Sequence, residues 1–267
     1  MKTRRTKAAT VAMYAVLIGL AALWLYPIGV AIVKSFAIGG IGNYEAVLNH
    51  PQFNYWSAVG NSFLIAGGST VVIVIIGSLG AFAFSRMRFR GRTVIYRLLL
   101  ACLAIPIAAV VTPLFTIISG MELRNTYIGV ILPLVSFNVV IMLMLLKNAF
   151  DGIPEEIVEA ATIDGARPFR IFWQIFVPLS GPAIATVSVL SFVYCWNEYL
   201  LPNLLLSDES MYPVTQAVSL LQFERMSQEQ IAQLYSGLIL LTIPSLLVYV
   251  SSQRYLQTGI TAGAVKS

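Results

Sequence analysis

Acidic side chains gather in one stretch of this chain, residues 151–182, at positions that suit the start of a helix. Five acids lie within fourteen residues there: Asp151, Glu155, Glu156, Glu159 and Asp164. Pro154 suits a first helical turn, which tolerates a missing N–H, and carboxylates directly after it complement the positive end of the helix dipole. The chemistry that this pattern predicts is helix capping and charge-assisted contact by carboxylates.

Two short helices must position these side chains. Ile157, Ala160 and Ala161 recur at i, i+3 and i+4, a narrow face of small apolar side chains, and Gly165 suits the left-handed conformation that ends a helix. Pro168 predicts the start of a second helix. The aromatic side chains of that helix fall at i, i+3, i+4 and i+7, a stripe suited to a membrane surface: Phe169, Phe172, Trp173 and Phe176.

The spacing of this helix-turn-helix resembles the EAA loop in permease subunits of bacterial ATP-binding-cassette (ABC) importers. Glu159-Ala160-Ala161, Gly165 and Ile175-Phe176-Val177-Pro178 carry the resemblance, with Val177 where the loop usually has Leu. In that family the short helix docks into a groove on a cytoplasmic ATPase and carries its closing motion into the membrane. An ordinary amphipathic interfacial helix would explain the caps but not the spacing. The resemblance implies coupling roles for Glu155, Glu159, Ala160, Ala161, Asp164, Gly165 and Pro178, with Glu159 contacting a basic group of the ATPase.

The composition predicts a membrane protein. Of 267 residues, 58% are hydrophobic and 11% are charged, far below the roughly 25% charged residues of a soluble domain. The net charge of +5 does not indicate nucleic-acid binding, because the basic residues cluster at the ends of apolar runs and report topology. The two cysteines lie in apolar runs without metal-ligand spacing, and the single histidine has no partner for catalysis, so the sequence predicts no metal, cofactor or catalytic residue.

The apolar runs predict an all-α fold of six transmembrane helices. The resemblance to ABC importer permeases implies in addition a cytoplasmic coupling helix and the type I ABC importer permease fold. The expected spans are about Ala8–Val33, Asn61–Phe84, Ile95–Ser119, Tyr127–Leu146, Leu179–Trp196 and Leu234–Ser251. We expect three parts: residues 1–60 with the first span and an outer loop, a permease core over 61–254, and a cytoplasmic tail over 255–267.

Charge asymmetry sets the expected orientation. With both chain ends inside the cell, only Lys34, Arg124 and Arg225 of the seventeen basic residues lie outside, which leaves fourteen inside. Five or seven spans would move Arg254 and Lys266 outside and weaken this asymmetry. We therefore expect a multi-pass protein of the bacterial plasma membrane with cytoplasmic N and C termini.

Other segments resemble the carbohydrate-uptake branch of these importers, of the maltose type. The matching segments are Asn61-Ser62, 81–86, 89–92, 123–129, 196–199 and 258–266. The resemblance implies a sugar substrate, a second homologous permease, two copies of a cytoplasmic ATPase and an extracytoplasmic substrate-binding protein, which the outer loop 197–233 is expected to touch. The chain has no G-x-x-x-x-G-K-[ST] phosphate loop, so the partner supplies the ATP site, and the chain is no enzyme.

Polar side chains within a span are costly unless they face a cavity or the bundle interior. Asn138, Tyr194, Trp196, Asn197 and Glu198 are therefore the candidates for a translocation path. A sugar route needs amides and hydroxyls to replace water and aromatic rings to cover apolar ring faces. Three alternatives stay open: a hydrogen bond from Asn138 to a neighbouring helix, a place for Trp196 in the interfacial aromatic belt, and a solvated position for Glu198.

The small number of charged residues in the spans distinguishes between rival functions. A charged solute would favour opposite charges along the path, and the spans carry almost none, so a neutral sugar fits better than a polyamine or glycerol phosphate, and a polyol remains open. An ion-coupled secondary transporter would want acids or histidines at mid-membrane, where none occurs. A non-transporting scaffold would bind an ATPase without ATP-dependent uptake.

Overall fold

The computed structural model describes residues 7–264, with side chains described for residues 9–253. Every regular element in that part of the chain is helical. The terminal basic side chains that support the expected orientation (Lys2, Arg4, Arg5, Lys7, Arg254 and Lys266) and the tail motif 258–266 lie outside the described side chains.

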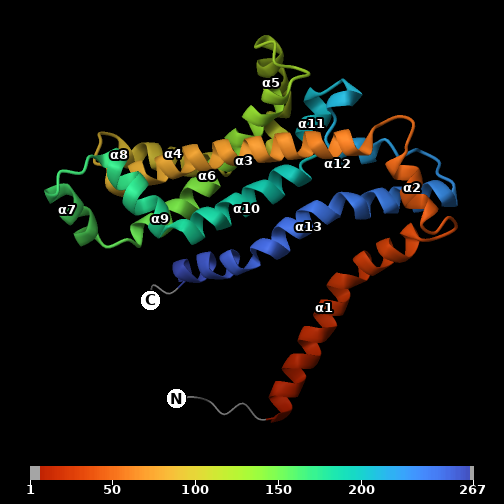
Figure 1. Cartoon of the computed structure of the whole chain (residues 1–267), viewed down its shortest axis with the longest axis horizontal. Coiled ribbons are helices and arrows are strands. Elements are labelled where there is room, and N and C mark those ends of the chain that lie inside the picture. Colours follow the sequence, from red (N-terminus) through yellow and green to blue (C-terminus); the bar gives the residue numbers. More distant parts are fainter. Residues whose placement is uncertain (1–6, 265–267) are drawn as a thin grey trace. The chain divides into compact units, whose positions relative to one another are not determined.

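The chain forms two compact units, which we describe separately. One unit holds residues 1–52 and 218–242, and the other holds 53–217 and 243–267. The first contains α1 (Lys7–Ser35), α2 (Gly42–Leu48) and the beginning of α13 (Gln228–Ala264). The second contains the helices that carry the candidate sites, and α13 continues into it (Figure 1). The expected boundary near residue 60 stays a prediction.

Four helices are long and apolar enough to cross a membrane: Ala9–Ser35 of α1, α3 (Tyr55–Arg86), α6 (Tyr127–Asp151) and Gln228–Gln253 of α13. Two bent pairs raise the number of candidate spans to as many as six, if each pair is counted as one span. The first pair is α4 (Arg92–Cys102) with α5 (Ile107–Gly120), bent by 102°, and the second is Pro168–Leu179 with α10 (Gly181–Asn197), bent by 80°. The all-α fold and the number of apolar segments agree with the sequence prediction.

The bends correct two expected spans. The third was expected as one run over Ile95–Ser119, but the helix stops at Cys102 and resumes after Pro106, which has no N–H to continue the ladder and is extended at φ −70° and ψ 136°. The fifth begins at Gly181 rather than at Leu179, with Pro182 in its first turn. Proline thus breaks the backbone hydrogen bonding in the third segment and suits the restart of the fifth.

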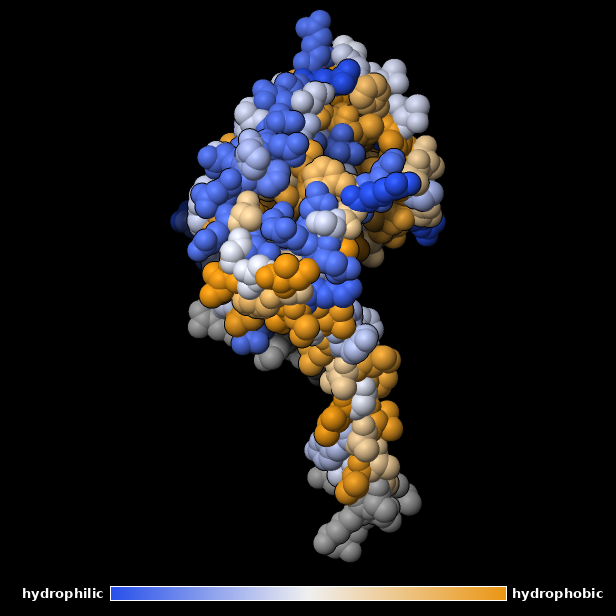
Figure 2. Space-filling view, turned by 90° about the vertical axis from the view of Figure 1, so that its right-hand side faces the viewer, coloured by the Kyte–Doolittle hydropathy of each residue, from blue (hydrophilic) through white to orange (hydrophobic). Residues whose placement is uncertain are grey.

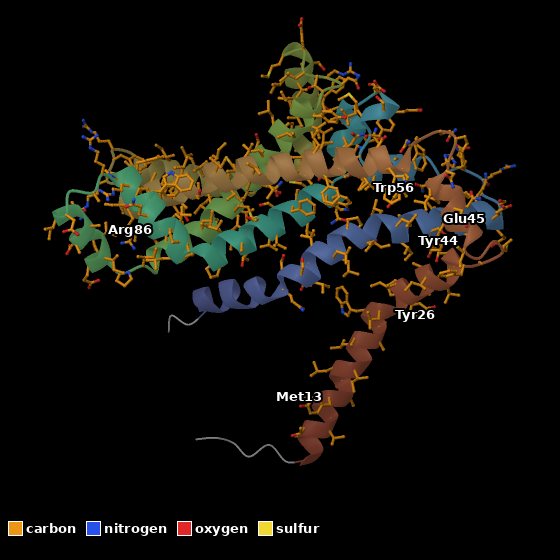
Figure 3. The ribbon with its side chains drawn as sticks, in the orientation of Figure 1. Met13, Tyr26, Tyr44, Glu45, Trp56 and Arg86 are labelled. Carbon is orange, nitrogen blue, oxygen red and sulfur yellow. The ribbon has the colours of Figure 1, made fainter. Side chains whose placement is uncertain are left out.

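The first unit is held by polar contacts at the end of α1. The Ser35 carbonyl accepts hydrogen bonds from Asn43 Nδ2 (2.9 Å) and from Ser236 Oγ (3.1 Å). The hydroxyl of Tyr44, which is labelled in Figure 3, lies 2.7 Å from Ser35 Oγ. These bonds satisfy a carbonyl that the end of α1 leaves free, and they join α2 and α13 to it.

Apolar side chains cover the outside of α1. Trp24, Tyr26 and Val33 are each at least 70% exposed, and the space-filling view shows orange side chains along this helix (Figure 2). A helix that is apolar all round needs an apolar solvent, as a bilayer provides. The exposure therefore agrees with the assignment of α1 as a span.

The core of the second unit lies where α3, α6 and α10 pack together (Figure 1). Its buried side chains are mainly branched aliphatics, among them Ile65, Ile73, Leu134, Leu146 and Val187. A Cβ on Gly80 would come within 2.6 Å of Leu143 Cδ1, so this glycine lets α6 approach α3. For Gly67, on the same helix, nothing among the described neighbours lies within 4 Å of the Cβ position, so this glycine permits no such approach there.

The start of α6 leaves no room for a side chain at Gly129. Thr126 caps this helix by accepting the Gly129 N–H at 3.0 Å, and the Thr126 hydroxyl donates to the Leu123 carbonyl at 2.7 Å. A Cβ on Gly129 would lie 2.0 Å from that carbonyl oxygen. The cap therefore depends on glycine.

We predict that Gly129→Ala destabilises the purified protein by roughly 1–3 kcal/mol, because the new methyl group must displace backbone. The control is Gly60→Ala, since nothing lies within 4 Å of that Cβ position. Thermal unfolding in detergent measures both. Equal melting temperatures for the two variants would contradict the prediction, because the turn before α6 would then accommodate the methyl group without loss of stability.

Candidate functional site

Residues 151–182, here called the coupling segment, contain a helix without buried residues, α7 (Glu155–Ile163). Pro154 precedes it and Glu155 and Glu156 occupy its first turn, as the sequence predicts. None of its residues is buried, and Ile163 is 86% exposed. Glu159, Ala160 and Asp164 are also exposed, and Ala161 is partly exposed. The helix thus presents apolar and acidic side chains that no described part of the chain buries.

Gly165 ends α7 in the predicted left-handed conformation, with φ at +78°. The Ala166 N–H donates to the Ala161 carbonyl at 2.9 Å, and the Gly165 N–H donates to the Thr162 carbonyl at 3.0 Å. This pair of bonds is the Schellman motif, which satisfies the last carbonyls of a helix. The direction in which the chain leaves α7 is therefore fixed by one glycine.

The second helix of the coupling segment differs from the prediction. It consists of α8 (Pro168–Ile171), a π-helical turn over Phe172–Phe176 and α9 (Val177–Leu179), where Pro178 is exposed. Phe169 and Trp173 are 67% and 53% exposed, but Phe172 and Phe176 are only 2% and 0% exposed. A π turn inserts a residue into the helical repeat, so the four rings do not share one face. The predicted membrane-surface stripe is therefore wrong for Phe172 and Phe176.

The two buried rings anchor the coupling segment to the core. Phe176 packs edge-on against Phe82 of α3 and Phe150 of α6, with ring centroids 4.9 and 5.2 Å apart. Phe172 packs against Phe82 at 5.5 Å. Aromatic pairs at such distances add about 0.5–1.5 kcal/mol each beyond burial. The return of the chain from α7 is thus fixed to two spans.

Arg86, the last residue of α3, holds the entrance to the same segment (Figure 3). Its Nη2 donates to the Phe150 carbonyl at 2.8 Å and also to the Ile153 carbonyl. Its guanidinium lies 5.4 Å from the centre of the Phe176 ring. These carbonyls lie at and just beyond the negative end of α6, where a cation is favoured. We call these contacts the Arg86 clasp.

Asp151 strengthens the clasp. Its two carboxylate oxygens accept hydrogen bonds from Ser85 Oγ (2.7 Å) and Lys147 Nζ (2.6 Å). In the sequence, Lys147 entered only the charge asymmetry, and Arg86 entered the charge asymmetry and the resemblance of segment 81–86. A run of arginines at the end of a span looks alike whichever residue bonds the backbone. The adjacent Arg88 and Arg90 are exposed, which separates Arg86 from its neighbours.

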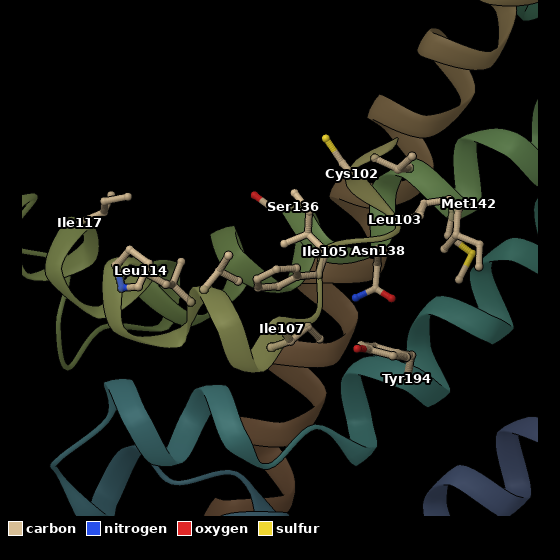
Figure 4. A pocket seen from close by; sticks show the side chains of 15 residues that line it. Cys102, Leu103, Ile105, Ile107, Leu114, Ile117, Ser136, Asn138, Met142 and Tyr194 are labelled. Atoms are coloured by element: carbon tan, nitrogen blue, oxygen red, sulfur yellow. The ribbon is translucent and has the colours of Figure 1, made fainter. Parts of the chain in front are cut away.

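A pocket of about 560 Å³ lies between α5, α6, α10 and the link before α5 (Figure 4). Apolar side chains such as Leu103, Ile107 and Leu114 form most of its wall. Asn138 and Tyr194 point into it from α6 and α10. Asn138 Nδ2 donates to the Leu134 carbonyl at 2.8 Å, which is a bond within its own helix and not to a neighbouring one. The structure brings these two predicted residues together.

The other three candidates for the path do not line this pocket. Trp196 is 1% exposed and packs against Phe63 and Phe192, with centroids 5.0 and 5.6 Å apart, so its placement in an interfacial belt is wrong. Asn197 Nδ2 donates to the Val193 carbonyl at 2.7 Å. Glu198 Oε1 accepts the Leu200 N–H at 2.9 Å at the start of α11 (Leu200–Leu205), so it caps a helix.

The loop 197–233, expected to lie outside, is bound to the beginning of α3 and to the turn before α6. Asn61 Nδ2 donates to the Ser210 and Tyr212 carbonyls at 2.8 and 3.1 Å, and Asn61 Oδ1 accepts the Tyr127 hydroxyl at 2.8 Å. Ser62 Oγ accepts the Val214 N–H at 2.8 Å. The sequence analysis noted Asn61 and Ser62 as part of a resemblance. In the structure their side chains bond loop residues that lie 149 to 152 positions later in the chain, and these bonds hold the loop.

Two further groups order the loop. Asn125 Oδ1 accepts the Ser207 and Asp208 N–H groups, each at 3.0 Å. Hydrogen bonds from Ser210 hold the pKa of the Asp208 carboxyl below its ordinary value. Within the described residues, no group of three or more His, Cys, Asp or Glu side chains is arranged to hold a metal ion.

Comparison with known proteins gives consistent matches. Residues 73–262 match the family model described as binding-protein-dependent transport system inner membrane component. A trehalose transport system permease protein of Mycobacterium tuberculosis is 33% identical over 226 residues, 84% of this chain and 81% of the relative. A diacetylchitobiose uptake system permease protein of Streptomyces coelicolor is 30% identical over 206 residues, 77% of this chain and 68% of the relative.

A solved structure supports the fold. The crystal structure of a bacterial ABC transporter involved in the import of the acidic polysaccharide alginate matches with a TM-score of 0.80. The match covers 94% of this chain and 98% of that chain at 24% sequence identity. At this identity the match shows a shared fold, and it leaves the solute open.

The end of α7 generates a local prediction. Gly165→Val places a β-branched side chain at a positive φ, which costs about 1–2 kcal/mol, so the population with α7 opened should rise roughly fivefold to thirtyfold. Gly165→Asn, which tolerates this conformation, is the matched control. Trypsin cleavage after Arg170 measures the opening, and equal cleavage rates for both variants would contradict it.

Proposed function

Because the chain belongs to the family of binding-protein-dependent transport system inner membrane components, we propose that it is the permease subunit of an ATP-driven ABC importer for a sugar. The observation that carries the proposal is α7, an exposed helix with the EAA spacing whose two ends are fastened to the core. A helix so exposed and so firmly rooted is suited to receive force from another protein. The chain itself is a transport component.

A sugar is the solute class that the comparisons and the pocket favour together. The relatives named above are permeases for trehalose and diacetylchitobiose, and an arabinooligosaccharide transport system permease protein of Halalkalibacterium halodurans is 30% identical over 212 residues. The pocket offers the Asn138 amide, the Tyr194 phenol and the Ser136 hydroxyl amid mainly apolar walls, and no charged side chain lines it. Such a lining suits a neutral hydroxylated ring with an apolar face.

An uncharged osmoprotectant is the second candidate. An osmoprotective compounds uptake permease protein of Synechocystis is 33% identical over 228 residues, 85% of this chain. Neutral polyols offer the hydroxyl groups of a sugar without its stacked ring face. A polyamine or glycerol phosphate would place a charge against the uncharged pocket wall, at a high desolvation cost.

The proposed assembly has four kinds of component. A second, homologous permease completes the membrane part, two copies of a cytoplasmic ATPase bind the permeases, and a substrate-binding protein delivers the sugar from outside. In one solved relative, a bacterial alginate ABC transporter is seen in complex with an alginate pentasaccharide-bound periplasmic protein. The outer loop 197–233, ordered by Asn61 and Asn125, is the proposed contact for the corresponding protein here.

The proposed mechanism follows from the positions of the chain's own residues. The small side chains at Ala160 and Ala161 let α7 seat closely in the ATPase, and Glu159 pairs with a basic group there. The docked helix moves when the ATPases close on ATP, and the spans attached to it rearrange. Asn138 and Tyr194 then exchange hydrogen bonds with the sugar as the pocket alternates between the two sides.

The orientation in the plasma membrane is tested by cysteine labelling. With both termini in the cytoplasm, a cysteine at Ser207 should react with an impermeant maleimide in intact cells. Cysteines at Arg90 and Thr162 should react only after the membrane is opened. The experiment uses a background without Cys102 and Cys195. Labelling of Thr162 from outside would end the proposal, because α7 could then meet no ATPase.

Docking is tested at Ala160. Ala160→Leu adds bulk on the small face without harming helix propensity, so we expect the helix to persist and ATPase co-purification to fall about tenfold or more. Thr162→Leu is the matched control, because Thr162 lies on the opposite face of the same exposed helix. Wild-type co-purification by Ala160→Leu would remove α7 from the interface.

The pocket is tested at Tyr194. Tyr194→Phe removes one hydroxyl, and a sugar hydroxyl left unpaired costs about 1–2 kcal/mol, so KM for uptake should rise roughly fivefold to thirtyfold. Tyr199→Phe is the control, since Tyr199 lies outside the pocket and is 42% exposed. ATPase co-purification should be unchanged in both. Identical KM values would place the sugar elsewhere.

A further inference from the structure

One helix of the second unit is fastened at both ends to the two segments that face outside partners. At one end of α3, Arg86 and Ser85 bind the coupling segment. At the other end, Asn61 and Ser62 bind the outer loop. Trp56 and Arg86 mark these two ends in Figure 3. The two attachments lie on a single element.

α3 is also the span best suited to act as one body. It runs unbroken for 32 residues and contains no proline. Every other candidate span in the described part of the chain contains a proline or is bent at a break. A proline removes a ladder hydrogen bond and allows a helix to bend, whereas an uninterrupted ladder resists bending. From Ser62 to Arg86 the helix extends about 36 Å, at 1.5 Å per residue.

The inner attachment is stronger than a single contact. The guanidinium of Arg86 donates to two carbonyls on the way into the coupling segment and faces Phe176 on the way out. Phe82, one turn earlier on α3, packs against Phe172 and Phe176. A movement of the coupling segment relative to α3 must therefore break charge-assisted bonds and separate packed rings at once.

The outer attachment is equally specific. Asn61 uses both donors of its amide and its acceptor, and these three bonds join the Ser210 carbonyl, the Tyr212 carbonyl and the Tyr127 hydroxyl. The residues held in this way, Ser210 and Tyr212, belong to the loop 197–233, the proposed contact with the binding protein. A displacement of this loop is thus passed directly to the start of α3.

We propose that Arg86 and Asn61 are positioning residues that make α3 one continuous mechanical connection between the coupling segment and the outer loop. The inference rests on the proposed function. Through this connection, docking of the binding protein and closure of the ATPases bias the same element. Two sites that bias one two-state element are coupled, which is the physical requirement for stimulation of ATP hydrolysis by the binding protein.

The test uses the assembled importer in proteoliposomes, with the chain, its second permease and its ATPase. ATP hydrolysis is measured with and without the system's own binding protein, loaded with whichever of trehalose, diacetylchitobiose and arabino-oligosaccharides it binds. Arg86→Lys keeps the charge but loses the two-pronged donor geometry. Asn61→Asp keeps the acceptor for Tyr127 and loses both donors. Arg88→Lys and Asn203→Asp, at exposed positions in the same two regions, are the controls.

We expect each single variant to lower stimulation at least about fivefold while basal hydrolysis and ATPase co-purification stay within about twofold of wild type. Stimulation in the double variant should stay within about twofold of stimulation in the more impaired single variant. Once one attachment is lost, the connection no longer transmits, so losing the second adds little. Melting temperatures, by contrast, should fall additively, since the two sites lie far apart. A merely structural role would not separate these two readouts.

Three results overturn the inference. Wild-type stimulation in both single variants would remove the connection, and a double variant whose loss is the product of the single losses, about twenty-fivefold, would show two independent effects. Loss of basal hydrolysis or co-purification together with stimulation would reduce the role to assembly. Where a variant fails to insert, Ser85→Ala replaces Arg86→Lys and Tyr127→Phe replaces Asn61→Asp in the same comparison. A wild-type importer without stimulation would contradict the proposed function itself.

Discussion

The structure of the second unit depends on how the backbone is satisfied where α6 ends. A helix leaves its last carbonyls without partners, and here the guanidinium of Arg86 takes the Phe150 carbonyl and the nearby Ile153 carbonyl. Because the donor belongs to α3, the carbonyls at the end of α6 are satisfied by a bond that joins the two spans. The exposed helix α7 follows directly and inherits a fixed starting point. Without this contact, α7 would be joined to the rest of the chain only by flexible loops and would move independently of α3 and α6.

A second constraint is the hydrocarbon interior of the bilayer, which offers the backbone no hydrogen-bond partners. Within the bilayer each backbone group needs an internal partner, and the bends at Pro106 and Ser180 place irregular backbone inside the chain's own spans. The bend before α5 opens the pocket into which Asn138 points. The same break that interrupts a span therefore creates the pocket in which we propose that the solute binds. The uninterrupted α3 beside it gives the bundle a stiff element.

The sequence allowed prediction of whatever depends on local pattern. The limits of α7, the left-handed Gly165 and the apolar runs follow from capping chemistry, dipole preference and length. Non-local packing was not predictable: the π turn that buries Phe172 and Phe176 depends on Phe82 and Phe150, which lie far away in sequence. Likewise, the sequence does not distinguish Arg86 from Arg88, because the carbonyls and the ring that Arg86 contacts come from distant residues. Of the predicted path, Asn138 and Tyr194 share a pocket, while burial of Trp196 reflects rings contributed by α3 and α10.

The central claim, that α7 is the element of this permease that meets the ATPase, has a direct test by site-specific photocrosslinking. A benzoylphenylalanine at Ile163, which is 86% exposed, is compared with one at Val71, 58% exposed on α3 within the membrane. In the purified importer, the probe at Ile163 should capture the ATPase, and the probe at Val71 should not. An assembled importer in which Ile163 yields no adduct with the ATPase would contradict the account.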